Sequence, residues 1–280
     1  MIQNIPKVKI GMVAVSRDCF PASLSKTRKM EVLKESTKLE LDLHDIPVIV
    51  ENENDAVKAL EIITQKRINA LVIYLGNFGP EGPETIIAQK FNGPVMFAAA
   101  AEESTASLID GRGDAYCGLL NASYNLGLRK TPAHIPEKPF GIASEIAKMI
   151  LEFIPVARAI LGIKNLKIFA FGPRPQDFLA CNAPIKALYD IGVEIMENSE
   201  LDLYDIFCRA KGQKTIKKIA SDMERELGEG NKFPDILEKL AQYEFALINF
   251  LENNLGASKF GIFANKCWPS FEKYFGFVPC

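Results

Sequence analysis

The chain has 280 residues, of which 48% are apolar and 24% charged, which predicts one large domain or two domains with a substantial core. The formal net charge of −2 argues against a nucleic-acid-binding protein, and no apolar run is long enough to span a membrane. The start, MIQNIPKVKIGMVAV, has none of the regions of a secretory signal. We therefore expect a cytoplasmic protein.

Cysteine and histidine usage argues against a His-rich metal site. The six cysteines have no CxxC spacing and are expected to be free thiols in a reducing compartment. The two histidines, His44 and His134, form no HxH, HxxH or HExxH pair. We therefore look to carboxylates, amides and arginines for functional groups.

Strands and helices alternate along the first half of the chain. Near-continuous apolar runs predict buried strands, and helical spacing of apolar residues predicts helices between them. Alternation of this kind gives a parallel sheet with right-handed crossovers, so we predict a flavodoxin-like layer. The expected strands are 7–16, 46–50, 70–75 and 94–100; the expected helices are 24–41, one capped by Asn54 or Asp55, and 84–90.

Polar loops follow these strands. Arg17 follows the first strand, Asn77 and Glu81 follow the third, and Glu102 and Glu103 follow the fourth. All should lie at the carboxyl edge of the sheet, where open α/β sheets bind ligands. No GxGxxG or GxxxxGK[ST] follows any strand, which weakens dinucleotide and P-loop interpretations. A flavin-nucleotide protein ranks last, because two adjacent glutamates would repel phosphate.

Arg112 lies between two glycines in the stretch DGRGDAYCGLLNASYN. Its guanidinium can form a bidentate bond with a ligand or with Asp110 or Asp114. Both interpretations stay open: a ligand contact, or a structural Arg–Asp clamp at a helix start.

The domain boundary is expected near Gly162. Residues 131–140 are rich in proline and should form an extended linker. Residues 141–161 should form an apolar helix that Pro155 kinks or breaks. We therefore predict two flavodoxin/Rossmann-like, three-layer α/β domains with parallel sheets, spanning 1–162 and 163–280.

The second domain opens with a strand–loop–helix–strand unit at 166–203. Arg174 lies in the first loop and Glu197 in the loop after the second strand, so both are candidates for holding a small polar ligand. The alternative is that Asp177 and Ser199 cap helices and that Arg174 pairs with a carboxylate. Helices are expected at 204–211, 215–227 and 235–253.

Six stretches spread over nearly the whole chain carry a family resemblance: VSRDCFP, YLGNFGPEGPE, DGRGDAYCGLLNASYNL, FGPRPQDFLACNAPI, GVEIMENSELDL and NKCWPSFEKYFGFVPC. Through them the chain resembles the N-terminal part of the L-fucose/L-arabinose isomerase family, particularly its fucose-isomerase-like members. The resemblance implies two α/β domains and a β-rich C-terminal domain, which we expect this sequence to lack. It also implies a homo-oligomer with active sites between subunits.

The activity that the resemblance implies is Mn²⁺-dependent interconversion of an aldose and a ketose. The metal would orient two sugar oxygens while carboxylates move the proton. The family's metal ligands follow the counterpart of CWPSFEKYFGFVPC, so no catalytic or metal-ligating residue carries over. Arg17 matches the arginine that reaches a neighbouring subunit's sugar, and Lys266 and Trp268 lie at the approach to the active-site segment.

Two functions stay open. The first is a sugar isomerase, present here as an N-terminal portion or as one subunit of a split enzyme with a C-terminal partner chain. The second is a non-catalytic sugar-binding or regulatory module. In both, the chain binds a monosaccharide, and alone it is expected to show no turnover. The expected sugar-binding residues are Arg17, Asn77, Arg112, Arg174, Glu197, Lys266 and Trp268.

Overall fold

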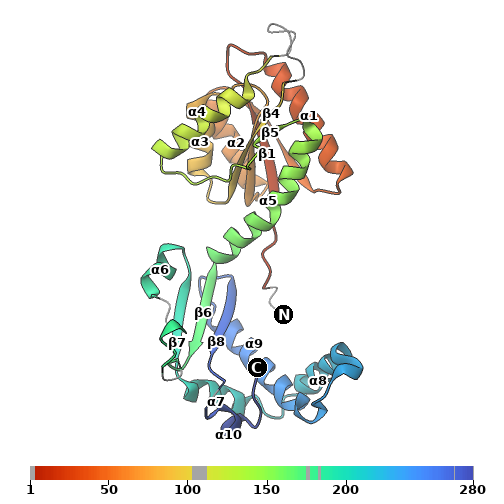
Figure 1. Ribbon diagram of the computed structural model, residues 1–280, viewed down its shortest axis with the longest axis vertical. Coiled ribbons are helices and arrows are strands. Elements are labelled where there is room, and N and C mark those ends of the chain that lie inside the picture. Colours follow the sequence, from red (N-terminus) through yellow and green to blue (C-terminus); the bar gives the residue numbers. More distant parts are fainter. Residues whose placement is uncertain (1–3, 103–111, 175–176, 182–183, 268, 280) are drawn as a thin grey trace. The chain divides into compact units, whose positions relative to one another are not determined.

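The computed structural model describes residues 4–102, 112–174, 177–181, 184–267 and 269–279. The chain forms two compact units (Figure 1). One is Pro6–Leu161, and the other joins Asn4 and Ile5 to the chain from Gly162 onwards. The side-chain amide of Asn4 both donates to the carbonyl oxygen of Gly261 and accepts from its N–H, at 2.7 and 2.9 Å.

The first unit is built on a five-stranded sheet with the order β2-β1-β3-β4-β5, and every pairing is parallel. In Figure 1, helices α2, α3 and α4 lie on one side of this sheet and α1 and α5 on the other. The strands are β1 (Ile10–Val15), β2 (Leu43–Val50), β3 (Ala70–Leu75), β4 (Val95–Ala100) and β5 (Phe140–Gly141). The helices are α1 (Ala22–Lys38), α2 (Glu53–Gln65), α3 (Glu81–Lys90), α4 (Ala115–Leu128) and α5 (Ala143–Ile163).

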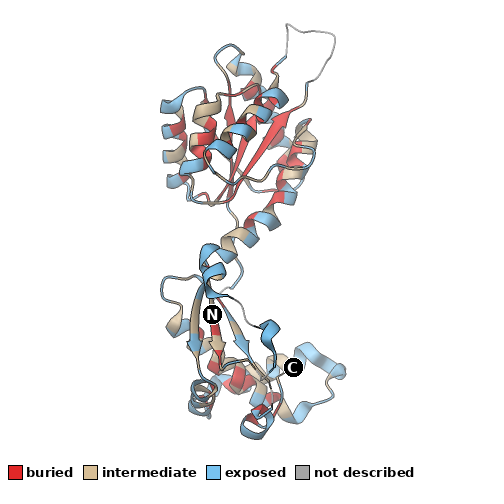
Figure 2. Ribbon diagram, turned by 60° about the vertical axis from the view of Figure 1, so that its left-hand side comes forward, coloured by how far each residue is buried: buried red, intermediate tan, exposed pale blue. Residues whose placement is uncertain are grey.

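The central strands are apolar because the sheet is covered on both faces. Strands β1, β3 and β4 are buried at every residue, and Figure 2 shows them as the continuous buried centre of this unit. The four predicted strands are all present. The short fifth strand was not predicted. It pairs with the end of β4 through Ala99↔Phe140 and Ala100↔Gly141.

Helix α1 departs from the expected amphipathic pattern, because polar side chains lie on its buried face. Ser25, Arg28 and Lys29 are all buried there. The ammonium of Lys29 lies 2.6 Å from a carboxylate oxygen of Asp45 and donates to the carbonyl oxygen of Ile46 at 2.8 Å. Burial of these charges is tolerated because each has partners.

Two local expectations need correction. Helix α2 is capped by Asn52, whose side chain accepts from the N–H of Asp55 at 3.1 Å, rather than by Asn54 or Asp55 themselves. Helix α5 continues through Pro155 from Ala143 to Ile163. Pro155 therefore does not break the helix, although proline removes one helical hydrogen bond.

The second unit is built on a three-stranded parallel sheet with the order β7-β6-β8. Together the two sheets confirm the predicted α/β fold class. The strands are β6 (Leu166–Phe171), β7 (Glu194–Asn198) and β8 (Phe260–Asn265). The helices are α6 (Ile185–Asp190), α7 (Glu200–Arg209), α8 (Lys214–Leu227), α9 (Leu237–Asn254) and α10 (Phe271–Phe275), with 3₁₀ turns at 179–181, 228–230 and 234–236.

An aromatic cluster forms the core of this unit. Phe169 and Phe171 of β6 pack on Phe250 of α9, with ring centroids 5.6 and 5.3 Å apart. Phe207 and Phe275 continue the cluster at 5.1 Å. Most of the buried side chains in this core are aromatic. Strand β8, which was not predicted, completes the three-stranded sheet.

Candidate functional site

The loops at the carboxyl edge of the first sheet are joined by Asn77, which follows β3. Asn77 is fully buried. Its side-chain oxygen accepts from the N–H of Arg17 at 3.0 Å, and its side-chain nitrogen donates to the hydroxyl of Ser16 at 2.8 Å. Asn77 therefore holds the loop after β1 against the loop after β3 and presents no free group to a cleft.

A second link joins the loop after β4 to helix α1. One guanidinium nitrogen of the buried Arg28 donates to the carbonyl oxygen of Gly76 at 2.8 Å, and another lies 3.1 Å from a carboxylate oxygen of Glu102. The same carboxylate accepts from the N–H of Gly113 at 3.2 Å. A charge-assisted pair with one buried partner fixes these loops more firmly than a surface ion pair.

Helix α4 approaches the loop after β3 too closely for any side chain at Gly118. A β-carbon built at Gly118 would overlap the carbonyl oxygen of Phe78. Glycine is the residue that permits such backbone contact. Phe78 is thereby fixed beside Arg17, whose guanidinium carbon lies 5.0 Å from the centre of its ring.

Arg17 lies on the rim of an open groove at this edge, as predicted from its position after β1. The groove has a volume of about 710 Å³ and is lined by Arg17, Asp18, Glu51, Asn52, Pro80, Glu81, Gly82 and Pro83. The guanidinium of Arg17 lies 3.6 Å from a carboxylate oxygen of Glu81, and the Arg17 side chain is 43% exposed. Asn125 donates to the other oxygen of Glu81 at 2.8 Å.

Arg112 takes the clamp geometry that the sequence left open. Its Nε donates to Asp114 at 2.6 Å, directly before α4. Hydrogen bonding and the charge of Asp114 raise the pKa of Arg112. Asp110, the other candidate partner, lies outside the described residues.

A buried carboxyl group that was not predicted lies behind this edge. Glu84 in the first turn of α3 is fully buried, and neither carboxyl oxygen has a hydrogen-bond partner among the described residues. Burial first, and then the charge of Glu81, raises the pKa of Glu84, and Arg17 opposes this shift. Burial therefore favours the neutral form of the Glu84 carboxyl group in the folded protein.

In the second unit, Arg174 and Lys266 line one pocket of about 300 Å³ at the carboxyl ends of β6 and β8. The ammonium of Lys266 lies 2.8 Å from a carboxylate oxygen of Glu200, which begins helix α7. Strand β8 brings these residues together by pairing with β6 from Leu166↔Phe260 to Phe171↔Asn265. Trp268, also predicted here, lies outside the described residues.

The predicted place of Glu197 was wrong. Glu197 lies within strand β7, paired with Ala170 of β6, and not in the loop after the strand. The loop begins at Ser199, which caps α7 in a capping box with Asp202. The capping role considered for Ser199 is thus the one observed.

The described residues contain no group of three or more histidine, cysteine, aspartate or glutamate side chains placed to hold a metal ion. Among them, also, no helix is long and apolar enough to cross a membrane.

The geometry defines a class: an α/β protein whose first unit carries a braced polar edge at the carboxyl ends of its parallel strands. Comparison with known families then gives the identity of that unit. The family described as fucose/sulfoquinovose isomerase, N-terminal domain, matches residues 11–164, more than half of the chain. The chain belongs to this family, which confirms the resemblance to fucose-isomerase-like proteins. No curated protein matches the chain.

Proposed function

We propose that the chain is the sugar-binding part of an aldose–ketose isomerase and that the rim around Arg17 contacts the sugar. The observation that carries the proposal is the place of Arg17 at an open groove within the matched residues 11–164. The family supports the isomerase function of the groove. The loops that Asn77 joins set the position of Arg17 at the groove.

The chemistry of the groove suits a polyhydroxyl ligand. Sugar hydroxyls both donate and accept hydrogen bonds. Arg17 supplies donors, because its 3.6 Å approach to Glu81 is longer than a hydrogen bond. Asp18, Glu51 and Glu81 supply acceptors. Opposite groups on one rim can therefore hold the hydroxyls of one sugar.

The charge of the groove favours a neutral sugar. Three carboxylates and one guanidinium line it. A negatively charged sulfonate would meet net repulsion there, because like charges at close range cost several kcal/mol. We therefore propose that the ligand is a neutral sugar, such as the deoxy sugar fucose, in preference to the negatively charged sulfoquinovose.

The described residues take the binding role only. No step of the proposal runs through Mn²⁺. We further propose that Arg17 contacts the sugar of a neighbouring copy, so that the working protein is a homo-oligomer. Light scattering should then give a mass above that of one 31.0 kDa chain; a monomer would contradict this part.

The test is thermal unfolding of the full chain with fucose, arabinose, their ketoses and sulfoquinovose, each with and without Mn²⁺. A ligand that binds only the folded state raises Tm by mass action. We expect a shift with fucose or its ketose and little with sulfoquinovose. A shift that does not depend on Mn²⁺ fits the sugar-binding part of a split isomerase or a binding module, and a shift that needs Mn²⁺ indicates metal ligands within this chain. No shift with any sugar would refute the proposal.

A further inference from the structure

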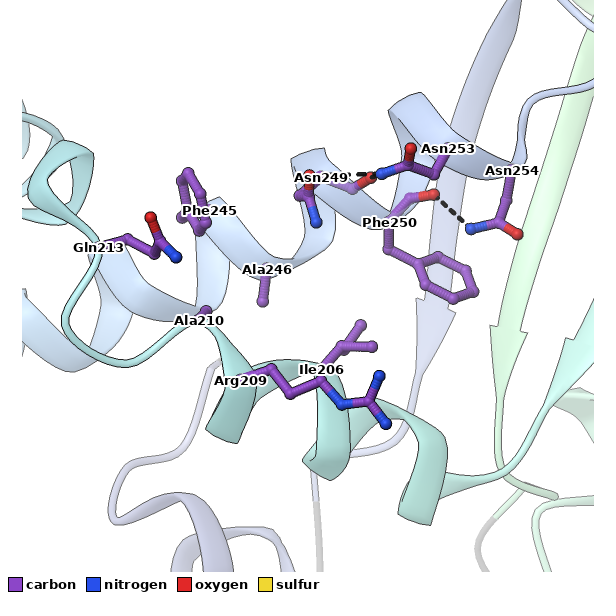
Figure 3. Close-up of a pocket in the computed structure, with 10 residues that line it drawn as sticks. All are labelled: Ile206, Arg209, Ala210, Gln213, Phe245, Ala246, Asn249, Phe250, Asn253 and Asn254. Atoms are coloured by element: carbon purple, nitrogen blue, oxygen red, sulfur yellow. Dashed lines mark hydrogen bonds between the residues drawn. The ribbon is translucent and has the colours of Figure 1, made fainter.

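Two cavities lie beside the end of helix α7 in the second unit, and their polar groups differ in what they contact. The first, of about 390 Å³, lies between α7 and α9 (Figure 3). Its polar groups are engaged locally: Asn253 donates to the carbonyl oxygen of Asn249 at 2.7 Å, and Arg209 pairs with Asp205 at 2.7 Å. This cavity therefore gives no indication of a ligand.

The second cavity, of about 690 Å³, is lined by four lysines: Lys211, Lys214, Lys217 and Lys239. Lys239 donates a hydrogen bond to the carbonyl oxygen of Gly276 at 3.3 Å. Within the described parts of the chain, the other three ammonium groups have no ion pair and no hydrogen-bond acceptor. Unpaired cations around one hollow repel one another, and an anion would relieve that repulsion.

Two carboxylates also line this cavity, Asp235 and Glu238. Four lysines against two carboxylates leave the lining positive. A ligand with one negative charge would gain little against these carboxylates. A group that carries about two charges, such as a phosphate monoester, gains more from the lysine side.

The start of helix α8 places further positive charge at the same cavity. Gln213 precedes the helix and makes no side-chain capping bond, and the first turn contains no acidic residue. Lys214 and Lys217 occupy that turn instead. Lysines at the positive end of a helix dipole lower stability, so this sequence is unfavourable for the helix unless an anion is bound beside it.

The floor of the cavity is apolar. Phe207, Phe275 and Ile216 are buried beneath it, and Tyr204 lies beside them. The volume lies within the range of about 300–1,000 Å³ that small-ligand sites occupy. We propose that this cavity binds a small organic phosphate, with its phosphate at Lys211, Lys214 and Lys217 and its ring on the apolar floor. This site is independent of the sugar groove.

Calorimetric titration of the full chain at constant ionic strength tests the proposal. The probes are pyrophosphate, which offers charge alone, and AMP, which adds a flat ring. We expect both to bind the native chain, AMP more tightly. The double variant K214M/K217M should bind about tenfold more weakly or worse, a loss of about 1.4 kcal/mol. Lys218→Met is the matched control, because Lys218 lies on the same helix but does not line the cavity.

Thermal unfolding without ligand gives a second readout that a purely structural role would not produce. Because Lys214 and Lys217 oppose the helix dipole, K214M/K217M should keep or raise the Tm of the free chain while it loses the Tm shift with AMP. The proposal is overturned if neither probe binds the native chain at millimolar concentration. An equal loss of binding in the Lys218→Met control would also overturn the proposal. That result would show that any positive charge removed from α8 weakens binding, whether or not it lines the cavity.

Discussion

The two sheets follow the same chain pattern but differ in how far they are buried. In the first unit, β1, β3 and β4 are buried throughout. In the second, β7 has no buried residue, and Ile262 of β8 is 44% exposed. Helix α6, which connects β6 to β7, has only six residues and none is buried. Parallel sheets are stable when helices cover both faces, so coverage by helices, more than strand sequence, separates the two units.

This difference has a consequence for the loops. In the first unit, buried polar residues such as Asn77 and Arg28 connect the loops after β1, β3 and β4. In the second, the ion pair of Lys266 with Glu200 involves a Glu200 side chain that is 36% exposed, and such pairs contribute little. The loops of the first unit are thus held by more buried polar contacts than those of the second. The predictions below test that contrast.

The largest effect is expected at Gly118. In Gly118→Ala the new β-carbon overlaps the carbonyl oxygen of Phe78, so the loop after β3 must shift. Overpacking of this kind costs about 3 kcal/mol or more when backbone must move. Urea unfolding of the full chain measures it. Gly127→Ala on the same helix is the control, because nothing lies within 4 Å of its β-carbon, and it should keep or gain stability.

Arg28→Met should have the next largest effect. It leaves the carbonyl oxygen of Gly76 without its buried donor and Glu102 without its cation. Glu102 is 33% exposed, so water offsets part of the loss, and we expect about 2–3 kcal/mol of destabilisation by urea unfolding. A change below about 0.5 kcal/mol, as for an ordinary surface pair, would show that the loops of the first unit are not braced.

Glu84→Gln should change the pH dependence of stability. Burial raises the pKa of Glu84 in the folded state, so the native protein binds this proton more tightly than the unfolded chain. Native stability is therefore lost as pH rises above about 4.3, the unfolded value. Glutamine does not titrate. The free energy of unfolding of the variant should therefore rise relative to that of the native protein, by about 1–2 kcal/mol, as the pH approaches neutrality.

The measurement for Glu84 is the free energy of unfolding between pH 4 and 8. Glu145→Gln is the control of opposite sign. Hydrogen bonds from Lys138 and from the N–H of Ile142 lower the pKa of the exposed Glu145, so its contribution is present at neutral pH and is lost as pH falls. Parallel stability curves for Glu84→Gln and the native chain would contradict the prediction.

The smallest effect is expected in the second unit, at Tyr243. Its hydroxyl is buried in the aromatic cluster and, among the described residues, has no hydrogen-bond partner. Burial raises the pKa of Tyr243 to about 12. Tyr243→Phe should therefore be neutral or stabilise by up to about 1 kcal/mol. A loss of more than 1 kcal/mol in thermal unfolding would reveal a partner for this hydroxyl.

Much of the first sheet could be predicted because buried parallel strands have unbroken apolar sequences. The run that forms β3 was predicted with its observed ends, Ala70 and Leu75. Strand β8 was missed because the short run Phe260–Asn265 contains a glycine and ends in the polar residue Asn265. Its strand character comes from pairing with β6, which local pattern does not record.

The candidate site was predictable in position but less so in role. The place of Arg17 follows from parallel topology, which sets strand ends at one edge. The inward direction of Asn77 and Arg28 does not, because polar residues are expected outside unless their partners are known. Glu84 was missed for the same reason: on sequence alone it is an ordinary first-turn glutamate.

The central claim is that Arg17 contacts a neutral sugar, and calorimetric titration of the full chain with fucose tests it most directly. We expect Arg17→Met to weaken binding about tenfold or more. Arg129→Met should bind as the native chain does, because Arg129 follows α4 and contacts Gln89 at 3.2 Å, outside the groove. Equal affinity in Arg17→Met and the native chain would contradict the account.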